Sequence, residues 1–167
     1  MAIEHDFFGI IDEDSSGGLY WSETVEVAEQ PVEVVLTAAD AAEVSESALD
    51  TAAAVINALE GLDARARDAL IADLSERGSV TTQYIDQRVD DLGQSLLDLL
   101  VHNSGDIPMD VLRSLQLLSV SLRPGNTADD DAFAVFTYSI DPDETDAVLQ
   151  VGFDDQGDVV TVDDGEQ

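Results

Sequence analysis

Cysteine and lysine are both missing from this chain of 167 residues. Without cysteine there is no disulfide framework, no thiolate zinc site and no cysteine nucleophile. Basic residues are few, because six arginines stand against 37 acidic residues and the formal net charge is −31 at pH 7. A field of that sign repels phosphate backbones and anionic lipid, so the composition disfavours binding to nucleic acid and to membrane surfaces.

Long hydrophobic runs are also missing. No segment approaches the ~20 apolar residues that a membrane-spanning helix needs. The N-terminal MAIEHDFFGII has no basic region before an apolar stretch, which a secretory signal requires. We therefore expect a cytoplasmic protein. Apolar residues still make up 44% of the chain and the mean hydropathy is −0.01, so a normal folded core is expected.

What is present is an alternation of apolar and polar residues, most clearly between positions 115 and 162. The runs LQLLSVSL, FAVFTYSI, DAVLQVGF and DVVTV are separated by polar breaks. Apolar residues at a period of two, rich in β-branched and aromatic types, are typical of strands with one buried face. The pattern predicts a C-terminal four-stranded antiparallel meander.

The N-terminal part of the chain also predicts strands. Two apolar runs, at positions 5–11 and 19–27, flank the polar break DEDSSGG, which indicates an antiparallel β-hairpin. A third strand, VEVVL, follows a turn at Gln30-Pro31. Alternation within the second run places Tyr20 and Trp21 on opposite faces.

Between the two groups of strands the apolar residues repeat at three and four positions, which predicts helices. The helix at Gly93 is interpreted as either kinked or divided in two. Asp63–Arg67 and Asp73–Arg77 are acid-then-base pairs four residues apart, which support helices weakly. Capping residues and glycines mark the expected helix ends: Ser47 with Asp50, Gly61, Asp63, Gly78, Thr81 or Thr82, and Pro108.

The order of strands, helices and strands favours an antiparallel α+β fold over alternating βαβ units. We predict a single α+β domain over residues 1–162, with an N-terminal antiparallel β-hairpin plus third strand, central helices and the C-terminal meander. The last residues, 163–167, are expected to form an acidic frayed tail.

The polar break in the first hairpin matches a calcium-binding loop. DEDSSGGLYWSE has acids or a hydroxyl at the ligand positions of an EF-hand, and its metal-binding candidates are Asp12, Asp14, Ser16 and Glu23. An EF-hand needs a helix after the closing glutamate, but TVEVAEQP alternates and then meets proline. A plain hairpin turn is therefore favoured, calcium binding is kept as an alternative, and no other cofactor is expected.

Partner-binding candidates are Tyr20, Trp21, Asp141 and Asp143. Because Tyr20 and Trp21 face opposite ways, one ring leaves the core unless a helix covers that face, and an exposed aromatic beside acids suits a protein-binding patch. Asp141 and Asp143 belong to an acid-rich break between strands. The alternatives are ring packing at a sheet edge and ordinary aspartate-stabilised turns.

No catalytic motif is present. His5 and His102 lack the clustered spacing of a metal site, and there is no Gly-x-Ser-x-Gly elbow and no phosphate loop with lysine. Carboxylates can be paired in many ways, so a carboxylate-dependent enzyme stays an alternative. The negative charge is interpreted as a solvated surface suited to a salty cytoplasm, as attraction to a basic partner, or as DNA mimicry. We expect a non-enzymatic protein that binds a basic protein in an immunity-type or adaptor role.

Several runs carry a resemblance over nearly the whole chain: FFGIID, LYW, PVEVVL, LDARARDAL, QYIDQRVDDL, LLSVSLRPG, FAVFTYSI and TDAVLQVGFDDQGDV. Together they resemble an uncharacterised bacterial domain family of unknown function. The resemblance implies one whole-length α+β domain of bacterial intracellular type, and it implies no activity, cofactor or catalytic residue. The aspartate-rich hairpin turn departs from that family pattern.

Overall fold

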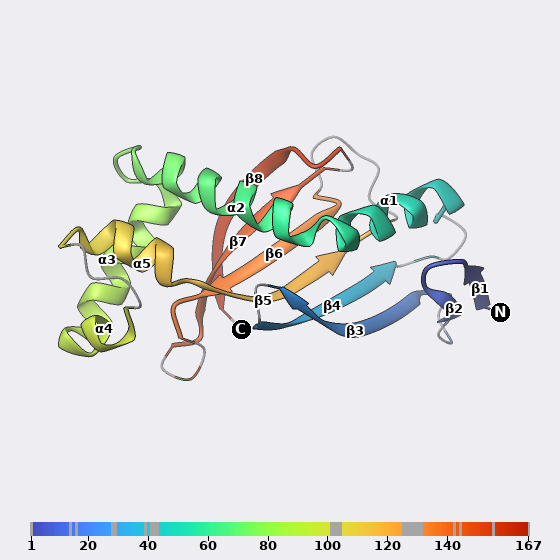
Figure 1. Ribbon diagram of the computed structural model, residues 1–167, viewed down its shortest axis with the longest axis horizontal. Coiled ribbons are helices and arrows are strands. Elements are labelled where there is room, and N and C mark those ends of the chain that lie inside the picture. Colours follow the sequence, from blue (N-terminus) through green and yellow to red (C-terminus); the bar gives the residue numbers. More distant parts are fainter. Residues whose placement is uncertain are drawn as a thin grey trace.

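The structure is a computed structural model whose elements follow the order strands, helices, strands (Figure 1). The chain therefore has the α+β fold that the sequence pattern predicts. The structure describes residues 2–13, 15, 17–27, 30–38, 40, 44–100, 105–124, 132–141, 143, 145–154 and 156–166.

Within the described residues, eight strands form one sheet in sequence order. The four N-terminal strands pair antiparallel with one another, and so do the four C-terminal strands, which confirms the predicted meander. The two halves meet where β4 and β5 run parallel. The strands are β1 (Ala2–His5), β2 (Gly9–Glu13), β3 (Leu19–Val27), β4 (Gln30–Ala38), β5 (Gln116–Leu122), β6 (Ala134–Ser139), β7 (Ala147–Phe153) and β8 (Val159–Glu166).

The helices form the crossover that this parallel junction requires, because parallel neighbours cannot be joined by a tight turn. In Figure 1 the first two helices lie across one face of the sheet, and the other three gather at one end. The helices are α1 (Glu46–Asn57), α2 (Leu59–Leu74), α3 (Val80–Leu92), α4 (Gln94–Leu99) and α5 (Ile107–Ser114).

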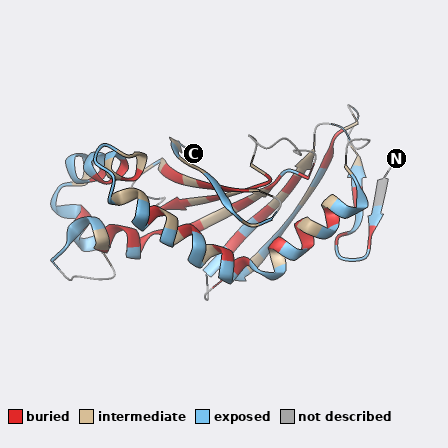
Figure 2. Cartoon of the chain, turned by 90° about the horizontal axis from the view of Figure 1, so that it is seen from above, coloured by how far each residue is buried: buried red, intermediate tan, exposed pale blue. Residues whose placement is uncertain are grey.

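The core lies between the helices and the inner face of the sheet, which is the face that they cover. On β4, Val32, Val34 and Leu36 are fully buried, while Glu33 between them is exposed. On α2, Leu62 and other residues at three- and four-residue spacing are buried against the sheet. Figure 2 shows buried residues along the strands and on the facing sides of the helices. The opposite face of the sheet, the outer face, carries mostly polar residues, such as Glu33 and Thr37 of β4, together with a few apolar ones, such as Val148 of β7.

Both ends of the described chain carry more strand than the sequence pattern predicts. A strand precedes the expected hairpin, because β1 pairs with β2 through the turn at residues 6–8. The acidic tail is also not frayed where it is described, because β8 continues to Glu166 and Asp163 and Asp164 pair with Gln150 and Leu149 of β7. Strand pairing uses backbone groups, so polar side chains did not reveal it.

Several helix ends also differ from the prediction. Ser45, not Ser47, caps α1, and its hydroxyl accepts from the Ala48 N–H at 3.0 Å. Gly61 and Asp63 lie inside α2, whose buried stripe continues past both of them. Local spacing found the helices, but packing against the sheet decides where they end.

The ends of the later helices are closer to the prediction. Ser79 caps α3, two or three positions before the expected threonines. Gly93 has φ +53° and separates α3 from α4, so the division is the correct alternative. Pro108 lies in the first turn of α5, as predicted, after an N-cap at Asp106. None of the described helices has both the length and the hydrophobicity needed to cross a membrane.

Candidate functional site

An exposed aromatic and an exposed aliphatic side chain lie together at the β1–β3 end of the sheet. Tyr20 is 57% exposed and Ile10 is 69% exposed. Asp12 pairs with Tyr20, and Glu4 pairs with Ile10, so all four side chains are on the outer face. We call Glu4, Ile10, Asp12 and Tyr20 the Tyr20 patch.

The alternation of β3 explains why Tyr20 is exposed. Its neighbours Leu19 and Trp21 point to the inner face, where Trp21 meets the buried ring of Phe8 edge-on with centroids 4.8 Å apart. The helices that cross the sheet, α1 and α2, lie on its inner side. Of the two aromatic candidates, Tyr20 is therefore the one that a partner can reach most fully.

Asp141 and Asp143 are not brought to this patch. They follow β6 at the end of the sheet near α3, whereas Tyr20 pairs with Thr37 at the opposite end of β4. Asp141 stabilises its own turn, because its carboxylate accepts from the Asp143 N–H at 2.9 Å. Asp143 is exposed. The four partner-binding candidates thus belong to separate surfaces.

The structure does not bring the described calcium candidates together. Asp12 pairs with Tyr20 on the outer face, and Glu23 lies three residues further along β3, where alternation directs it to the inner side. Residues 24–27 continue the strand where an EF-hand has a helix. Asp14 and Ser16 lie outside the described residues. Calcium binding at this hairpin stays a prediction that the placement of Asp12 and Glu23 does not support.

Histidine and carboxylate side chains form contacts that hold the fold. His5 is buried, its Nδ1 accepts from the Phe7 N–H at 3.1 Å, and its Nε2 lies 2.7 Å from Oδ1 of Asp50. The backbone contact places the proton of the neutral ring on Nε2, which donates to Asp50. Both ring nitrogens are occupied, so His5 joins β1 to α1. Across the described part of the chain, no group of three acidic or histidine side chains is placed to hold a metal ion.

A second set of contacts joins α2 to the sheet. The Tyr138 hydroxyl donates to Asp63 at 2.6 Å, and Arg67 Nε donates to both Asp63 oxygens at 3.2 Å. Arg67 also donates to the Leu115 carbonyl at 2.9 Å. Burial raises the pKa of Tyr138 well above its ordinary value, and the Asp63 charge raises it further. The predicted Asp63–Arg67 pair is confirmed, whereas Asp73 accepts from the Thr81 N–H instead of pairing with Arg77.

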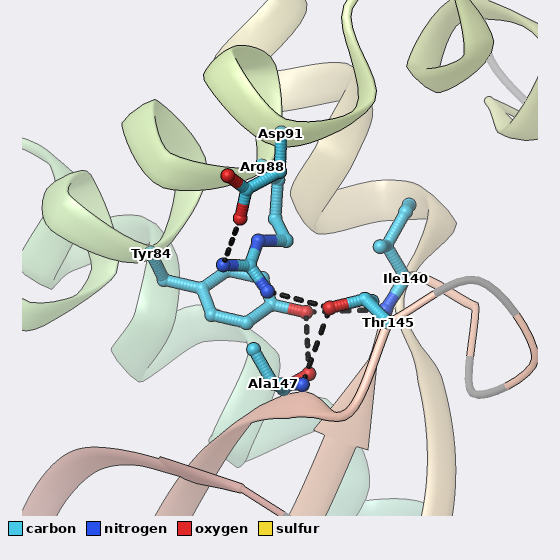
Figure 3. A network of polar contacts seen from close by, with 6 residues as sticks. All are labelled: Tyr84, Arg88, Asp91, Ile140, Thr145 and Ala147. Atoms are coloured by element: carbon cyan, nitrogen blue, oxygen red, sulfur yellow. Dashed lines mark hydrogen bonds and ion pairs between the residues drawn. The ribbon is translucent and has the colours of Figure 1, made fainter.

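A third set of contacts centres on the buried Arg88 of α3 (Figure 3). Arg88 donates to the Thr145 hydroxyl at 2.6 Å and to the Asp91 carboxylate at 3.0 Å, and its guanidinium lies over the Tyr84 ring. The Tyr84 hydroxyl donates to the Ala147 carbonyl and accepts from the Ile140 N–H. Burial raises the pKa of Tyr84, partly offset by the Ile140 hydrogen bond and the Arg88 charge. These groups bind one another, so they hold Ile140, Thr145 and Ala147 against α3.

Two hollows lie on either side of Val27. One, of about 310 Å³, is lined by Asp63, Arg67 and Arg113, and the contacts above already hold its carboxylate. The other, of about 430 Å³, is lined by Glu26 of β3 and Glu60 of α2, which are both exposed. An enzyme that uses paired carboxylates stays an alternative prediction.

The residues that organise these contacts are not marked by any motif in the sequence. Tyr84 and Arg88 lie on the buried side of α3 and Tyr138 lies on the buried face of β6, and the sequence pattern alone does not reveal what their polar groups bind. Their partners are far away in the chain: Tyr138 and Asp63 are 75 positions apart, and Arg88 and Thr145 are 57 positions apart. Buried arginine is rare without a partner, so its position on the buried face of α3 was the available signal.

No family model, curated protein or solved structure matches the chain. The resemblance to an uncharacterised bacterial domain family therefore stays a prediction.

Proposed function

We propose that this protein acts without catalysis and binds a basic protein through the Tyr20 patch, in an immunity-type or adaptor role. The observation that carries the proposal is the pairing of an exposed tyrosine and isoleucine with two carboxylates on the outer face of the sheet. We propose the cytoplasm as its compartment and the bacterial family named above as its relatives.

The chemistry of the patch defines the partner. Arginine or lysine of a partner can lie over the Tyr20 ring, a contact worth about 0.5–1 kcal/mol when exposed and more when desolvated. Asp12, directly across from Tyr20, can pair with the same cation. Ile10 supplies apolar area that a charge pair alone lacks. A formal charge of −31 speeds encounter with a basic surface and repels acidic ones.

The test uses immobilised protein and its native cell lysate at low and high salt, followed by purification and calorimetry of the captured protein. We expect a basic protein that elutes with salt and binds Tyr20→Ala/Ile10→Ser about tenfold or more weakly. Leu97→Ser is the matched control, because Leu97 is a similarly exposed aliphatic residue on α4. Capture of no basic protein at either salt concentration overturns the proposal, as does equal loss of affinity in the control.

A further inference from the structure

Among the described residues, the last strand of the sheet, β8, is paired on one side only. β8 pairs with β7 on one side, and an antiparallel strand turns the N–H and C=O groups of alternate residues away from its neighbour. Within the described residues, no hydrogen bond reaches β8 other than those of the β7 pairing. In Figure 2 the strand that ends at the C-terminus crosses the view, and α2 and α3 are the helices that pack close to β8.

The side chains of β8 change character along its length. Val159 and Val160 at its start are 38% and 39% exposed. Asp163, Asp164 and Glu166 at its end are all exposed. An eight-residue edge with apolar groups at one end and carboxylates at the other has both the backbone groups and the side chains for pairing with another strand.

A second copy of this chain is a poor occupant for that edge. Two β8 strands paired in parallel would set their carboxylates side by side, and charged residues on an edge strand are a known way to prevent edge-to-edge pairing. Each copy also carries the same charge of −31. The same carboxylates attract a strand of the opposite sign.

We propose that the free edge of β8 binds an extended basic segment of a partner protein by strand addition. The segment continues the sheet beyond β8, and its backbone bonds the outward N–H and C=O groups. Arginine or lysine residues lie beside Asp163, Asp164 and Glu166, and apolar residues lie beside Val159 and Val160. Backbone pairing supplies affinity, and the apolar-to-acidic change along β8 sets direction and register.

This surface is distinct from the Tyr20 patch, because β1 and β8 are the opposite edges of the sheet. Both surfaces are proposed to bind a basic partner. They have no residue in common. Either surface can therefore fail while the other binds.

The experiment titrates the whole protein with an eight-residue peptide. One half of the peptide has arginine at alternate positions, and the other half contains valine. Amide hydrogen exchange and calorimetry are the measurements. We expect slower exchange at outward amides of β8, with exchange in β1 unchanged and affinity falling as salt rises. A peptide with a central proline, which cannot pair along its length, is expected to bind about tenfold or more weakly. Equal binding of the proline peptide overturns strand addition.

Charge variants distinguish the effect of the carboxylates on β8 from the effect of the protein's net charge. Asp163→Lys/Asp164→Lys is expected to weaken the peptide about tenfold or more. Asp68→Lys/Asp98→Lys changes the net charge equally at exposed positions of α2 and α4 and is expected to retain binding within about a factor of three. Equal weakening in the control, or protection at β3 instead of β8, overturns the inference. Tyr20→Ala is expected to leave peptide binding unchanged, which separates this result from the proposed function.

Discussion

The hydroxyl of Tyr138, in β6, donates a hydrogen bond of 2.6 Å to Oδ1 of Asp63 on α2. Arg67 completes the contact, because it pairs with the carboxylate and its guanidinium lies 5.2 Å from the centre of the Tyr138 ring. A helix that crosses a sheet is otherwise held by apolar packing, which allows sliding. These three side chains fix where α2 lies on the sheet.

We predict that Tyr138→Phe lowers the free energy of unfolding by about 1–3 kcal/mol, because it removes a buried hydrogen bond to a charged group and keeps the ring. Urea unfolding measures the change. Tyr20→Phe is the matched control and is expected to stay within about 0.5 kcal/mol of the native protein, since the ring is exposed. Equal destabilisation by both substitutions would contradict the role given to the Tyr138 hydroxyl.

A second prediction concerns Arg88. Lysine in its place has one ammonium group and cannot bond Thr145 and Asp91 while lying over the Tyr84 ring, as the planar guanidinium does. We expect Arg88→Lys to cost about 1–3 kcal/mol in urea unfolding. Arg77→Lys, at an exposed position, serves as the control and is expected to be near neutral. A neutral Arg88→Lys would show that the contacts of Figure 3 contribute little.

A third prediction concerns alkaline pH. Burial raises the pKa of both Tyr84 and Tyr138, so the native state keeps these protons where the unfolded chain loses them. Their contribution to stability is complete below the unfolded pKa of about 10 and is lost as pH rises above it. The expected slope is about 1.4 kcal/mol per pH unit for each tyrosine.

Urea unfolding between roughly pH 9 and pH 11 measures this slope around the tyrosine pKa. Tyr84→Phe and Tyr138→Phe should each remove about half of it, and the double variant should remove nearly all of it. The prediction fails if the double variant loses stability with pH as steeply as the native protein does.

The fold was largely predictable because its strands have one buried face. Val32, Val34 and Leu36 occupy alternate positions of β4, and these are the residues that are buried. β1 escaped prediction, since four residues are too few for a period to emerge. The C-terminal half of β8 escaped for another reason: Asp163 and Asp164 look like a solvated tail, yet their backbone completes the pairing with β7.

The candidate site was less predictable than the fold. Alternation separated Tyr20 from Trp21 correctly, but it could not say which face the helices cover, because that depends on the hand of the crossover between β4 and β5. The matching positions of Asp12 and Glu23 suggested a shared metal, while the pairing of β2 with β3 directs them to opposite faces. A spacing that brings two side chains together in a loop separates them in a strand.

The last prediction concerns salt. With 37 acidic residues against six basic ones, most carboxylates repel one another, and the compact native state holds them closer than the unfolded chain does. Raising sodium chloride from about 0.01 M to about 0.5 M shortens the screening length from roughly 30 Å to below 8 Å. We expect stability to rise by at least about 1 kcal/mol, which is roughly 3 °C in Tm for a chain of this size.

Sucrose, which adds no charge, distinguishes screening from a general solvent effect. The gain in sodium chloride should be steepest below about 0.15 M and then level off, because screening at the distance between neighbouring surface charges is then nearly complete. A melting temperature insensitive to salt would mean that the carboxylates are spaced widely enough to be tolerated, and the charge would then matter chiefly for what the protein binds.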